Sequence, residues 1–548
     1  MYPRILGELL FMSEVTRRGL LGAAGGAAFG LAGGVGLAPA APAHAATTPA
    51  REGARVVPDD PRYADLVLRG NNRRFVGTPD YVTVVDSTEQ VVRAVEDAVR
   101  SGKRIAVRGG GHCFENFVDD PKVKVILDLS QLSEVTYDAR RRAFAIGAGA
   151  TLDQVYKALY YGWGVTVPGG GCLSVGVGGH FSGGGYGPLS RLFGSVVDHL
   201  YAVEVVVVDR AGRARPVVAT REPSDPNRDL WWAHTGGGGG NFGVVTRYFM
   251  RSSGVSGTDP SRALPKPPAA LLSSYVVWDW KTVTKAGFAR TLSNFFGWYE
   301  KHSAPDSPYA SLYSPFLIPT SANDGFLLST QIDAGIPDAK ARLAAFHAAV
   351  VEGVEPTPYV GEPVEGPFLA STRARSIQET ATPNRAKLKA AYLRKGYSDG
   401  QITTLHKHLT NPDYRNPNSL ALLVPYGGQV NTVTPSATAT AQRDSIMKVV
   451  YTASWDNPGE DAENLAWVRS VYREVYADTG GVPVPNSVND GSYVNYPDVD
   501  LADPAWNTSG VPWHALYYKE NYPRLQRIKA RWDPRNLFRH ALSIELPD

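Results

Sequence analysis

The sequence predicts an α+β protein with two domains, and three observations support this prediction. Strand and helix patterns alternate from about Pro79 onward, interrupted by glycine-rich blocks. A Ser/Gly/Pro-rich stretch at Ser252–Pro268 reads as a linker. Beyond it, strands and helices alternate without glycine clusters to about Pro485. We therefore expect one domain over residues 47–255, a second over 256–485, and a C-terminal segment, 486–548, that returns to the first.

Composition narrows the class of protein. The chain has 548 residues, of which 43% are hydrophobic and 20% charged, as in an ordinary globular protein. Its 56 basic and 53 acidic residues leave a net charge of +3, which gives no reason to expect a nucleic-acid partner. Glycine is the unusual residue, with 56 of 548, against an average of roughly 7%. The glycines are concentrated in a few blocks, and these blocks are the candidate binding site.

The first 46 residues read as an export signal. The pair Arg17-Arg18 precedes a Gly/Ala-rich stretch without charged residues, and Ala43-His44-Ala45 offers a small-x-small cleavage site. These features favour twin-arginine export and an extracytoplasmic protein. The alternative is a membrane anchor, but the many glycines and alanines make a poor one. After removal of the signal we expect no association with a membrane.

The first domain begins with a strand–helix–strand pattern. Tyr81–Val85 reads as a strand, and Ser87 with Gln90 predicts a capping box at the start of a helix. The next strand, Arg104–Arg108, runs into three glycines and His112. Glycine lets backbone N–H groups approach an anionic phosphate, so this arrangement indicates a cofactor site.

A second glycine block follows a predicted strand at Ala143–Ile146 and a helix at Thr151–Tyr161. From Pro168 to Gly187, glycine occupies about every second position, so a flat ligand could lie against bare backbone. A strand at Tyr201–Val208 comes next. In the second domain the patterns predict strands and helices in these ranges: strands Leu271–Trp278, Gly325–Ile332, Leu420–Tyr426 and Met447–Trp455; helices Lys285–His302, Asp338–Val351 and Ala462–Ala477.

Several simpler interpretations of these residues are weak. Gly238, Gly240 and Gly243 have the spacing of a dinucleotide-binding motif, but a β-like run follows them instead of a helix. Four histidines lack the compact spacing of metal ligands: His112, His180, His199 and His234. A nucleophile elbow is absent in its required strand–turn–helix setting. In an exported protein, Cys113 and Cys172 could also form a disulfide.

Taken together, the blocks resemble a known family. The motifs that carry the resemblance are Arg108-Gly-Gly-Gly-His112, Gly-Gly-Gly-Cys172, Val175-Gly-Val-Gly-Gly-His180, Gly183-Gly-Gly-Tyr-Gly187, Asn241-Phe-Gly-Val-Val-Thr246, Tyr493-Val-Asn-Tyr496 and Asp533-Pro-x-Asn-x-Phe538. They are similar to those of the berberine-bridge-enzyme-like FAD oxidases, which have the vanillyl-alcohol-oxidase fold. The resemblance runs from about Pro79 to Asp548 and is strongest to the antibiotic-tailoring branch.

The resemblance implies a bicovalently attached FAD. His112 would bind the flavin 8α-methyl carbon through a ring nitrogen, and Cys172 would bind C6 through its sulfur. The other residues that it places at the cofactor are Arg108, Gly109, Gly110, Gly111, Gly169, Gly170, Gly171, Val177, Gly178, Gly179, His180, Gly183, Val245 and Asn495. The alternatives are a hydrogen-bonded loop histidine at 112, and a free thiol or a disulfide at 172.

The resemblance also implies a reaction. Alcohol oxidation needs a base facing the substrate hydroxyl, and Tyr493 matches the family's catalytic tyrosine. Because a free phenol has a pKa near 10, we expect neighbouring groups to lower the pKa of Tyr493. Tyr186 matches a second active-site tyrosine but could equally pack against the ring edge, and Tyr426 is a weaker pocket candidate.

The expected partners are a small-molecule substrate, such as a glycosylated polyketide oxidised at a sugar hydroxyl, and O2, which would be reduced to H2O2. A simple carbohydrate oxidase of the same fold is the alternative enzyme. An exported ligand-binding protein is the alternative from another class.

Overall fold

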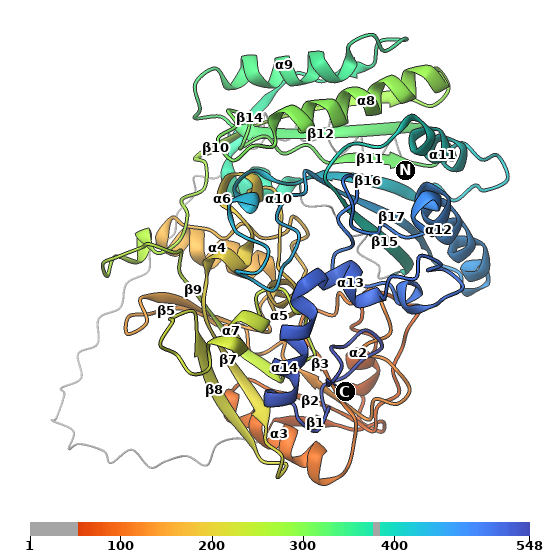
Figure 1. The fold of residues 1–548 in the computed structure, drawn as a ribbon. Coiled ribbons are helices and arrows are strands. Elements are labelled where there is room, and N and C mark those ends of the chain that lie inside the picture. Colours follow the sequence, from red (N-terminus) through yellow and green to blue (C-terminus); the bar gives the residue numbers. More distant parts are fainter. Residues whose placement is uncertain (1–52, 376–383, 548) are drawn as a thin grey trace, which may run out of the picture. The chain divides into compact units, whose positions relative to one another are not determined.

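Three β-sheets organise the part of the chain that this computed structural model describes, residues 53–375 and 384–547 (Figure 1). The expected signal at residues 1–46 lies outside the described residues. Residues Glu52–Asp548 form one compact unit. Helices and strands are both present throughout it, which confirms the mixed fold class.

The first sheet has the strand order β1-β2-β4-β3. Its strands are β1 (Ala54–Val56), β2 (Tyr81–Val84), β3 (Ile105–Arg108) and β4 (Val125–Asp128). Strand β4 runs parallel to both β2 and β3, and its register sets Arg108 opposite Asp128. Helix α2 (Tyr63–Val67) packs against β2. The parallel pairing thus delivers the end of β3 directly into the first glycine loop.

Helix α3 (Thr88–Arg100) connects β2 to β3 and packs on both the first and the second sheet. Its predicted capping box forms only in part, because the Gln90 side chain reaches Asp86 instead of the N-cap Ser87. Ser87 Oγ accepts from the Gln90 N–H at 3.4 Å, while Gln90 Oε1 accepts from the Asp86 N–H at 2.9 Å. The buried face of α3 is Val91, Ala94, Val95 and Ala98, as its 3.6-residue period predicts.

The second sheet is antiparallel, in the order β5-β6-β9-β7-β8. Its strands are β5 (Val135–Asp138), β6 (Ala143–Gly147), β7 (Leu200–Val208), β8 (Ala214–Thr220) and β9 (Val244–Met250). The helices between them are α4 (Leu152–Trp163), α5 (Val177–Ser182), α6 (Ser190–Phe193) and α7 (Arg228–Ala233). Strand β9 follows Gly243 directly, so a strand does follow the third glycine block, as predicted.

Helix α5 is the main departure from the predicted second glycine block. The sequence pattern predicted no helix in this block, only bare backbone against which a flat ligand could lie, but Val177–Ser182 is helical. The backbone N–H groups of Val177 and Gly178 donate to the carbonyls of Ala150 and Ala148 at 2.8 and 3.1 Å. These bonds satisfy the first turn of the helix, whose N–H groups have no partner within it.

The third sheet has eight strands, in the path β13-β10-β12-β11-β16-β17-β15, with β14 also paired to β10. Its strands are β10 (Ala270–Asp279), β11 (Phe316–Pro319), β12 (Gly325–Asp333), β13 (Tyr359–Val360), β14 (Val364–Pro367), β15 (Arg385–Leu393), β16 (Leu420–Pro425) and β17 (Met447–Trp455). The predicted β10, β12, β16 and β17 are confirmed within two residues. Strands β11 and β15 were not predicted.

Helices cover one face of this sheet (Figure 1). They are α8 (Lys285–His302), α9 (Ala339–Val351), α11 (Asp399–Leu409) and α12 (Asp461–Val475). Helix α10 (Phe368–Ala374) packs beside β10 and β14. The opposite face of the sheet carries Leu388, Leu422 and Val450, which border a cavity described below.

The C-terminal segment contains two helices that the sequence patterns did not indicate, α13 (Trp513–Tyr518) and α14 (Tyr522–Trp532). It contacts the third glycine block. Tyr518 donates its hydroxyl proton to the Gly237 carbonyl at 3.1 Å, and Lys529 Nζ donates to the Asn241 carbonyl at 2.7 Å.

Among the described residues, the structure contains no helix with both the length and the apolar character that crossing a bilayer demands.

Candidate active site

A cavity of about 520 Å³ lies between the glycine loops and the face of the third sheet that the helices do not cover. All three glycine blocks, the third sheet and the C-terminal segment contribute to its wall. Among the predicted residues, those that line it are Arg108, Gly109, Gly110, Gly111, His112, Gly170, Gly171, Cys172, Gly178, Gly179, His180, Tyr186, Val245, Tyr493 and Asn495. Its size is in the range of cofactor and ligand sites.

Three predicted residues lie behind the wall rather than in it. Val177 is fully buried in the core. A Cβ on Gly169 would lie 2.7 Å from the Tyr156 hydroxyl, and one on Gly183 would lie 1.9 Å from Asn495 Oδ1. These two glycines therefore make room for neighbouring side chains of the protein.

The first two glycine loops touch each other through glycine. A Cβ on Gly110 would lie 2.3 Å from the Gly176 nitrogen, and a Cβ on Gly176 would lie 2.2 Å from the Gly110 nitrogen. Only residues without a side chain allow this approach. By contrast, a Cβ on Gly179 would meet nothing within 4 Å, so this helical backbone faces open space. Part of the glycine excess serves loop packing, and part leaves bare backbone at the cavity.

Arg108, which lines the cavity, has a buried cationic donor without a partner in the described part of the chain. Its Nε donates to Asp128 Oδ2 at 3.2 Å and its Nη2 to the Leu66 carbonyl at 2.5 Å. Its Nη1 is buried and has no hydrogen-bond partner among the described residues. A buried donor of this kind fits an anionic group. With the bare backbone at Gly179, it makes the cavity suitable for the phosphates of a dinucleotide.

His112 and Cys172 both line the cavity, one from each of the first two glycine loops. Neither Cys172 nor Cys113 is part of a disulfide, so the disulfide alternative is wrong for this structure. Cys113 Sγ lies 3.2 Å from the Glu115 carbonyl, and burial raises the pKa of its thiol to about 12.

His180 holds the second glycine loop in place. The Gly170 N–H donates to His180 Nε2 at 3.0 Å, so this nitrogen carries a lone pair and the ring is neutral. Burial, with a smaller contribution from Lys448, lowers the pKa of His180 to about 3.

Four tyrosines surround a lysine that sequence reasoning missed. Lys448 Nζ lies 3.2 Å from the ring centroid of Tyr186 and 3.7 Å from that of Tyr493. The rings of Tyr426 and Tyr392 are 4.4 and 4.5 Å away. Such short distances are typical of cation–π contacts. The signal was present in the sequence: Lys448 is a charged residue in the otherwise buried start of β17.

The Tyr493 hydroxyl accepts two hydrogen bonds. The Gly185 N–H donates to it at 3.0 Å and Asn495 Nδ2 at 2.9 Å. Asn495 Nδ2 also donates to the His180 carbonyl at 2.9 Å, which fixes its orientation. The Tyr186 and Tyr496 hydroxyls are 2.8 Å apart and hydrogen-bonded. An oxygen that accepts two N–H donors is suited to carry negative charge.

Burial opposes this tendency. It raises the pKa of Tyr493 well above its ordinary value of 10, and the Asn495 and Gly185 donors offset only part of the increase. The protein's own groups therefore do not lower the pKa of Tyr493, and that prediction is wrong. Burial, together with the Arg443 charge, also lowers the pKa of Lys448 well below 10.5. A charge on Lys448 becomes favourable once a nearby phenol loses its proton, so the two groups are expected to titrate as a pair.

The wall opposite the glycine loops carries polar side chains beside the apolar Leu388, Leu422 and Val450, and none of the described residues in it is a carboxylate. Its polar side chains are Tyr313, Ser329, Gln331, Thr372, Arg375 and Thr452. Arg375 Nη1 donates to the Thr330 carbonyl at 2.5 Å, which orients its guanidinium. Such a wall offers hydrogen-bond donors and acceptors to a hydroxylated molecule.

Comparisons with known proteins agree with this geometry. Residues 79–213 match the model of an FAD binding domain, and residues 492–545 match the berberine and berberine-like model. The aclacinomycin-N/aclacinomycin-A oxidase of Streptomyces galilaeus is 53% identical over 98% of this chain and all of its own length. The hexose oxidase of Chondrus crispus is 32% identical over 88% of this chain and 93% of its own length.

A glycopeptide hexose oxidase solved in complex with teicoplanin is 56% identical. Its structure superimposes with a TM-score of 0.88 and covers 91% of this chain and all of that chain. Two family models match parts of the chain, and relatives match nearly its whole length. The chain therefore belongs to the berberine-bridge-enzyme-like family of FAD-dependent oxidoreductases.

Proposed function

We propose that this protein is an FAD-dependent oxidase that converts a sugar hydroxyl of a bulky secondary metabolite, such as a glycosylated polyketide, into a carbonyl. The observation that carries the proposal is Tyr493, which lines a cavity of about 520 Å³ and whose hydroxyl accepts two N–H donors beside Lys448. Relatives named for aclacinomycin and for glycopeptide hexose oxidation support the substrate class.

In this mechanism the Tyr493 oxygen takes the proton of the substrate hydroxyl. The Gly185 and Asn495 N–H groups and the Lys448 ammonium stabilise the phenolate that must exist beforehand. Tyr186 and Tyr496, joined by their hydrogen bond, orient the substrate on the neighbouring side. The chemistry that bound FAD supplies is acceptance of the hydride from the substrate carbon, followed by reoxidation with O2 and release of H2O2.

The two candidate attachment residues support a bicovalent linkage. His112 and Cys172 come from different loops, and both line the cavity in which Arg108 and Gly179 suit the dinucleotide. Attachment at two points would hold the flavin while leaving the polar wall open to a large substrate. We also propose that residues 1–46 direct twin-arginine export of the folded protein, which the paired arginines support.

The experiment that tests the function is a peroxide assay with purified protein. We expect H2O2 formation with glycosylated polyketides, and loss of at least 99% of it in Tyr493→Phe. Absence of peroxide with every glycoside and free sugar tested would overturn the proposal.

A simple carbohydrate oxidase is the second candidate, favoured by the 32% identity to a hexose oxidase. It predicts a higher kcat/KM for free hexoses than for glycosides.

A further inference from the structure

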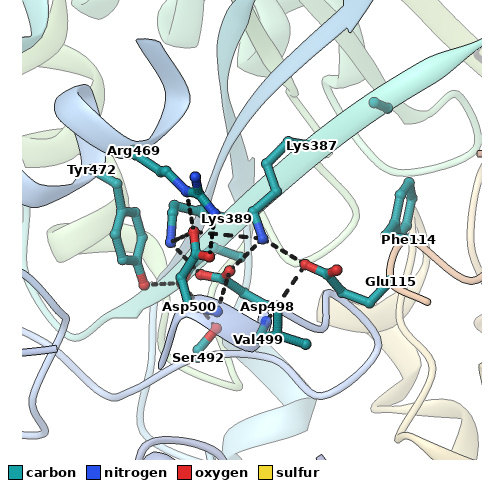
Figure 2. Close-up of polar contacts among 12 residues, drawn as sticks. Phe114, Glu115, Lys387, Lys389, Arg469, Tyr472, Ser492, Asp498, Val499 and Asp500 are labelled. Atoms are coloured by element: carbon teal, nitrogen blue, oxygen red, sulfur yellow. Dashed lines mark hydrogen bonds and ion pairs between the residues drawn. The ribbon is translucent and has the colours of Figure 1, made fainter. Parts of the chain in front are cut away.

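A cluster of charged side chains surrounds Lys387 and Lys389 of β15 (Figure 2). Leu388 lines the cavity. Its neighbours Lys387 and Lys389 point away from it, because successive side chains of a strand alternate between faces. The partners of the two lysines are Glu115, Asp498 and Asp500, and Arg469 of α12 completes the cluster.

Lys387 connects two segments that are distant in sequence. Its Nζ lies 2.5 Å from Glu115 Oε1 and 2.7 Å from Asp498 Oδ1. Glu115 comes three residues after His112, and Asp498 five residues after Tyr493. We call residues 109–115 the His112 loop and residues 493–500 the Tyr493 segment. Lys387 thus bridges the loop of one candidate attachment residue and the segment of the candidate base.

Lys389 resembles Lys387 in burial and shares its partners Asp498 and Asp500, the latter 3.6 Å from Lys387 Nζ, but Lys389 has no contact with Glu115. Its Nζ lies 2.6 Å from Asp498 Oδ2 and 2.9 Å from Asp500 Oδ2, both in the Tyr493 segment. Lys387 and Lys389 have side-chain exposures of only 1% and 2%. Within the described part of the chain, Lys387 is the cation of this cluster that also contacts Glu115.

Arg469 lies at the outer end of the cluster, with 28% of its side chain exposed, and contacts Asp500 at 2.8 Å. Three cations therefore face three carboxylates. The cluster is balanced in charge, although it is nearly excluded from water.

A cluster of this kind is poorly explained by stability alone. Removing charges from water costs several kcal/mol per ion, and well-packed apolar side chains often stabilise a fold equally well. What buried pairs supply is defined geometry, because losing one partner leaves an uncompensated charge. Lys387 Nζ therefore fixes the carboxylates of Glu115 and Asp498 relative to each other. The backbones of the His112 loop and the Tyr493 segment are fixed with them.

We propose that Lys387 is a positioning residue that sets the His112 loop in register with the Tyr493 segment. The inference rests on the proposed function, since it concerns the alignment of the attachment loop with the base. Two further contacts also hold this loop: the Val499 N–H of the Tyr493 segment donates to Glu115 Oε1 at 3.5 Å, and Asn72 joins the loop to β15. Asn72 Nδ2 donates to the carbonyls of Phe114 at 2.8 Å and Ala386 at 3.0 Å. Cutting the ionic bridge should therefore loosen the loop without releasing it.

The test compares Lys387→Met with Lys389→Met in the holoenzyme. Both variants remove a buried lysine of β15 and leave one buried carboxylate charge uncompensated. Their loss of folding stability should therefore be similar. Hydrogen-exchange mass spectrometry should show faster exchange in both the His112 loop and the Tyr493 segment for Lys387→Met. For Lys389→Met the increase should stay within the Tyr493 segment. Equal exchange patterns in the two variants would overturn the proposal.

Glu115→Gln provides a second route in case Lys387→Met does not fold. It removes the loop's carboxylate and leaves Lys387 paired with Asp498. We expect faster exchange in the Tyr493 segment, across the cut bridge, and a kcat at least tenfold below that of Lys389→Met. The KM should stay within twofold, because none of these residues contributes to the polar wall opposite the glycine loops. Small displacements of reacting groups commonly cause rate losses of about 10²-fold.

An unchanged exchange rate in the Tyr493 segment of Glu115→Gln would also overturn the inference. Exchange reports on the bridge without any substrate, so its outcome is independent of the proposed reaction. Failure of the peroxide assay with a normal exchange result would refute the function and leave the bridge intact.

Discussion

At the scale of single residues, the proton chemistry depends on one lysine among four aromatic rings. Lys448 Nζ has no hydrogen-bond partner among the described residues, and its contacts are the rings of Tyr186, Tyr493 and their neighbours. A buried ammonium is unfavourable unless it is paired with a negative charge. The phenolate of Tyr493 would provide that charge. In the form that is ready to react, Lys448 is therefore protonated and Tyr493 is not.

Lys448→Met should therefore change the pH dependence of the reaction. The base must be unprotonated, so kcat/KM rises with pH to a plateau above the apparent pKa of the pair. Without the positive charge the phenolate is less stable, and we expect this apparent pKa to move up by about two units. At pH 7 we expect kcat/KM to fall about 100-fold, with recovery at high pH. The measurement is a pH–rate profile of peroxide formation.

Tyr493→Phe is the control for this profile, because it removes the base and should lower the rate at every pH. A Lys448→Met profile with an unmoved midpoint would contradict the pairing.

At the scale of elements, the short helix α5 links the stability of the second glycine loop to pH. His180 accepts the Gly170 N–H only as a neutral ring, and its pKa in the folded protein is about 3, against about 6.5 in the unfolded chain. The stabilising contribution of the neutral ring is complete above pH 6.5 and is lost progressively as the pH falls toward 3. Between pH 6.5 and 5 the loss is at most about 2 kcal/mol, and less because the ring is partly exposed at the cavity.

His180→Gln should reduce this loss, because glutamine keeps an acceptor for Gly170 but does not titrate. We expect the free energy of unfolding to fall less between pH 7 and 5 in the variant than in the wild-type protein. Denaturant unfolding at both pH values measures the difference. Other buried histidines, such as His234, titrate in both proteins and cancel in the comparison. Identical pH dependence would show that the Gly170 contact does not control the loop.

The elements also show what sequence patterns can and cannot predict. Strands such as β7 and β17 were predicted closely because they are nearly continuous apolar runs, buried along most of their length, and helix α8 because its apolar residues recur with the helical period. Helix α5 was missed because its glycines carry no hydrophobic period, and α14 because it lies in a motif-rich tail. Gly110 packs on Gly176, whereas Gly179 faces the cavity. This difference depends on tertiary contacts, so the sequence pattern could not predict it. Lys448 was missed for the same reason: its ring of tyrosines comes from four separate segments.

At the scale of the whole molecule, the cavity is a site where parts of the chain that are distant in sequence come together. Its wall includes the three glycine blocks, the third sheet and the C-terminal segment. A ligand bound there contacts all of them and stabilises the folded state by mass action, by about 2.7 kcal/mol at 100 times its Kd. A covalently attached ligand keeps the site filled at any concentration. Attachment through His112 and Cys172 would therefore make the stability of the fold independent of free FAD.

The double variant His112→Ala/Cys172→Ala tests this directly. We expect it to release its yellow colour on acid precipitation, whereas each single variant keeps coloured protein in the pellet. Its melting temperature should rise with added FAD, while that of the wild-type holoprotein should not change, since its site is already filled. If the wild-type protein also released its flavin into the acid supernatant, the covalent linkage would be refuted. If added FAD left the melting temperature of the double variant unchanged, the cofactor would not be what holds these segments of the chain together.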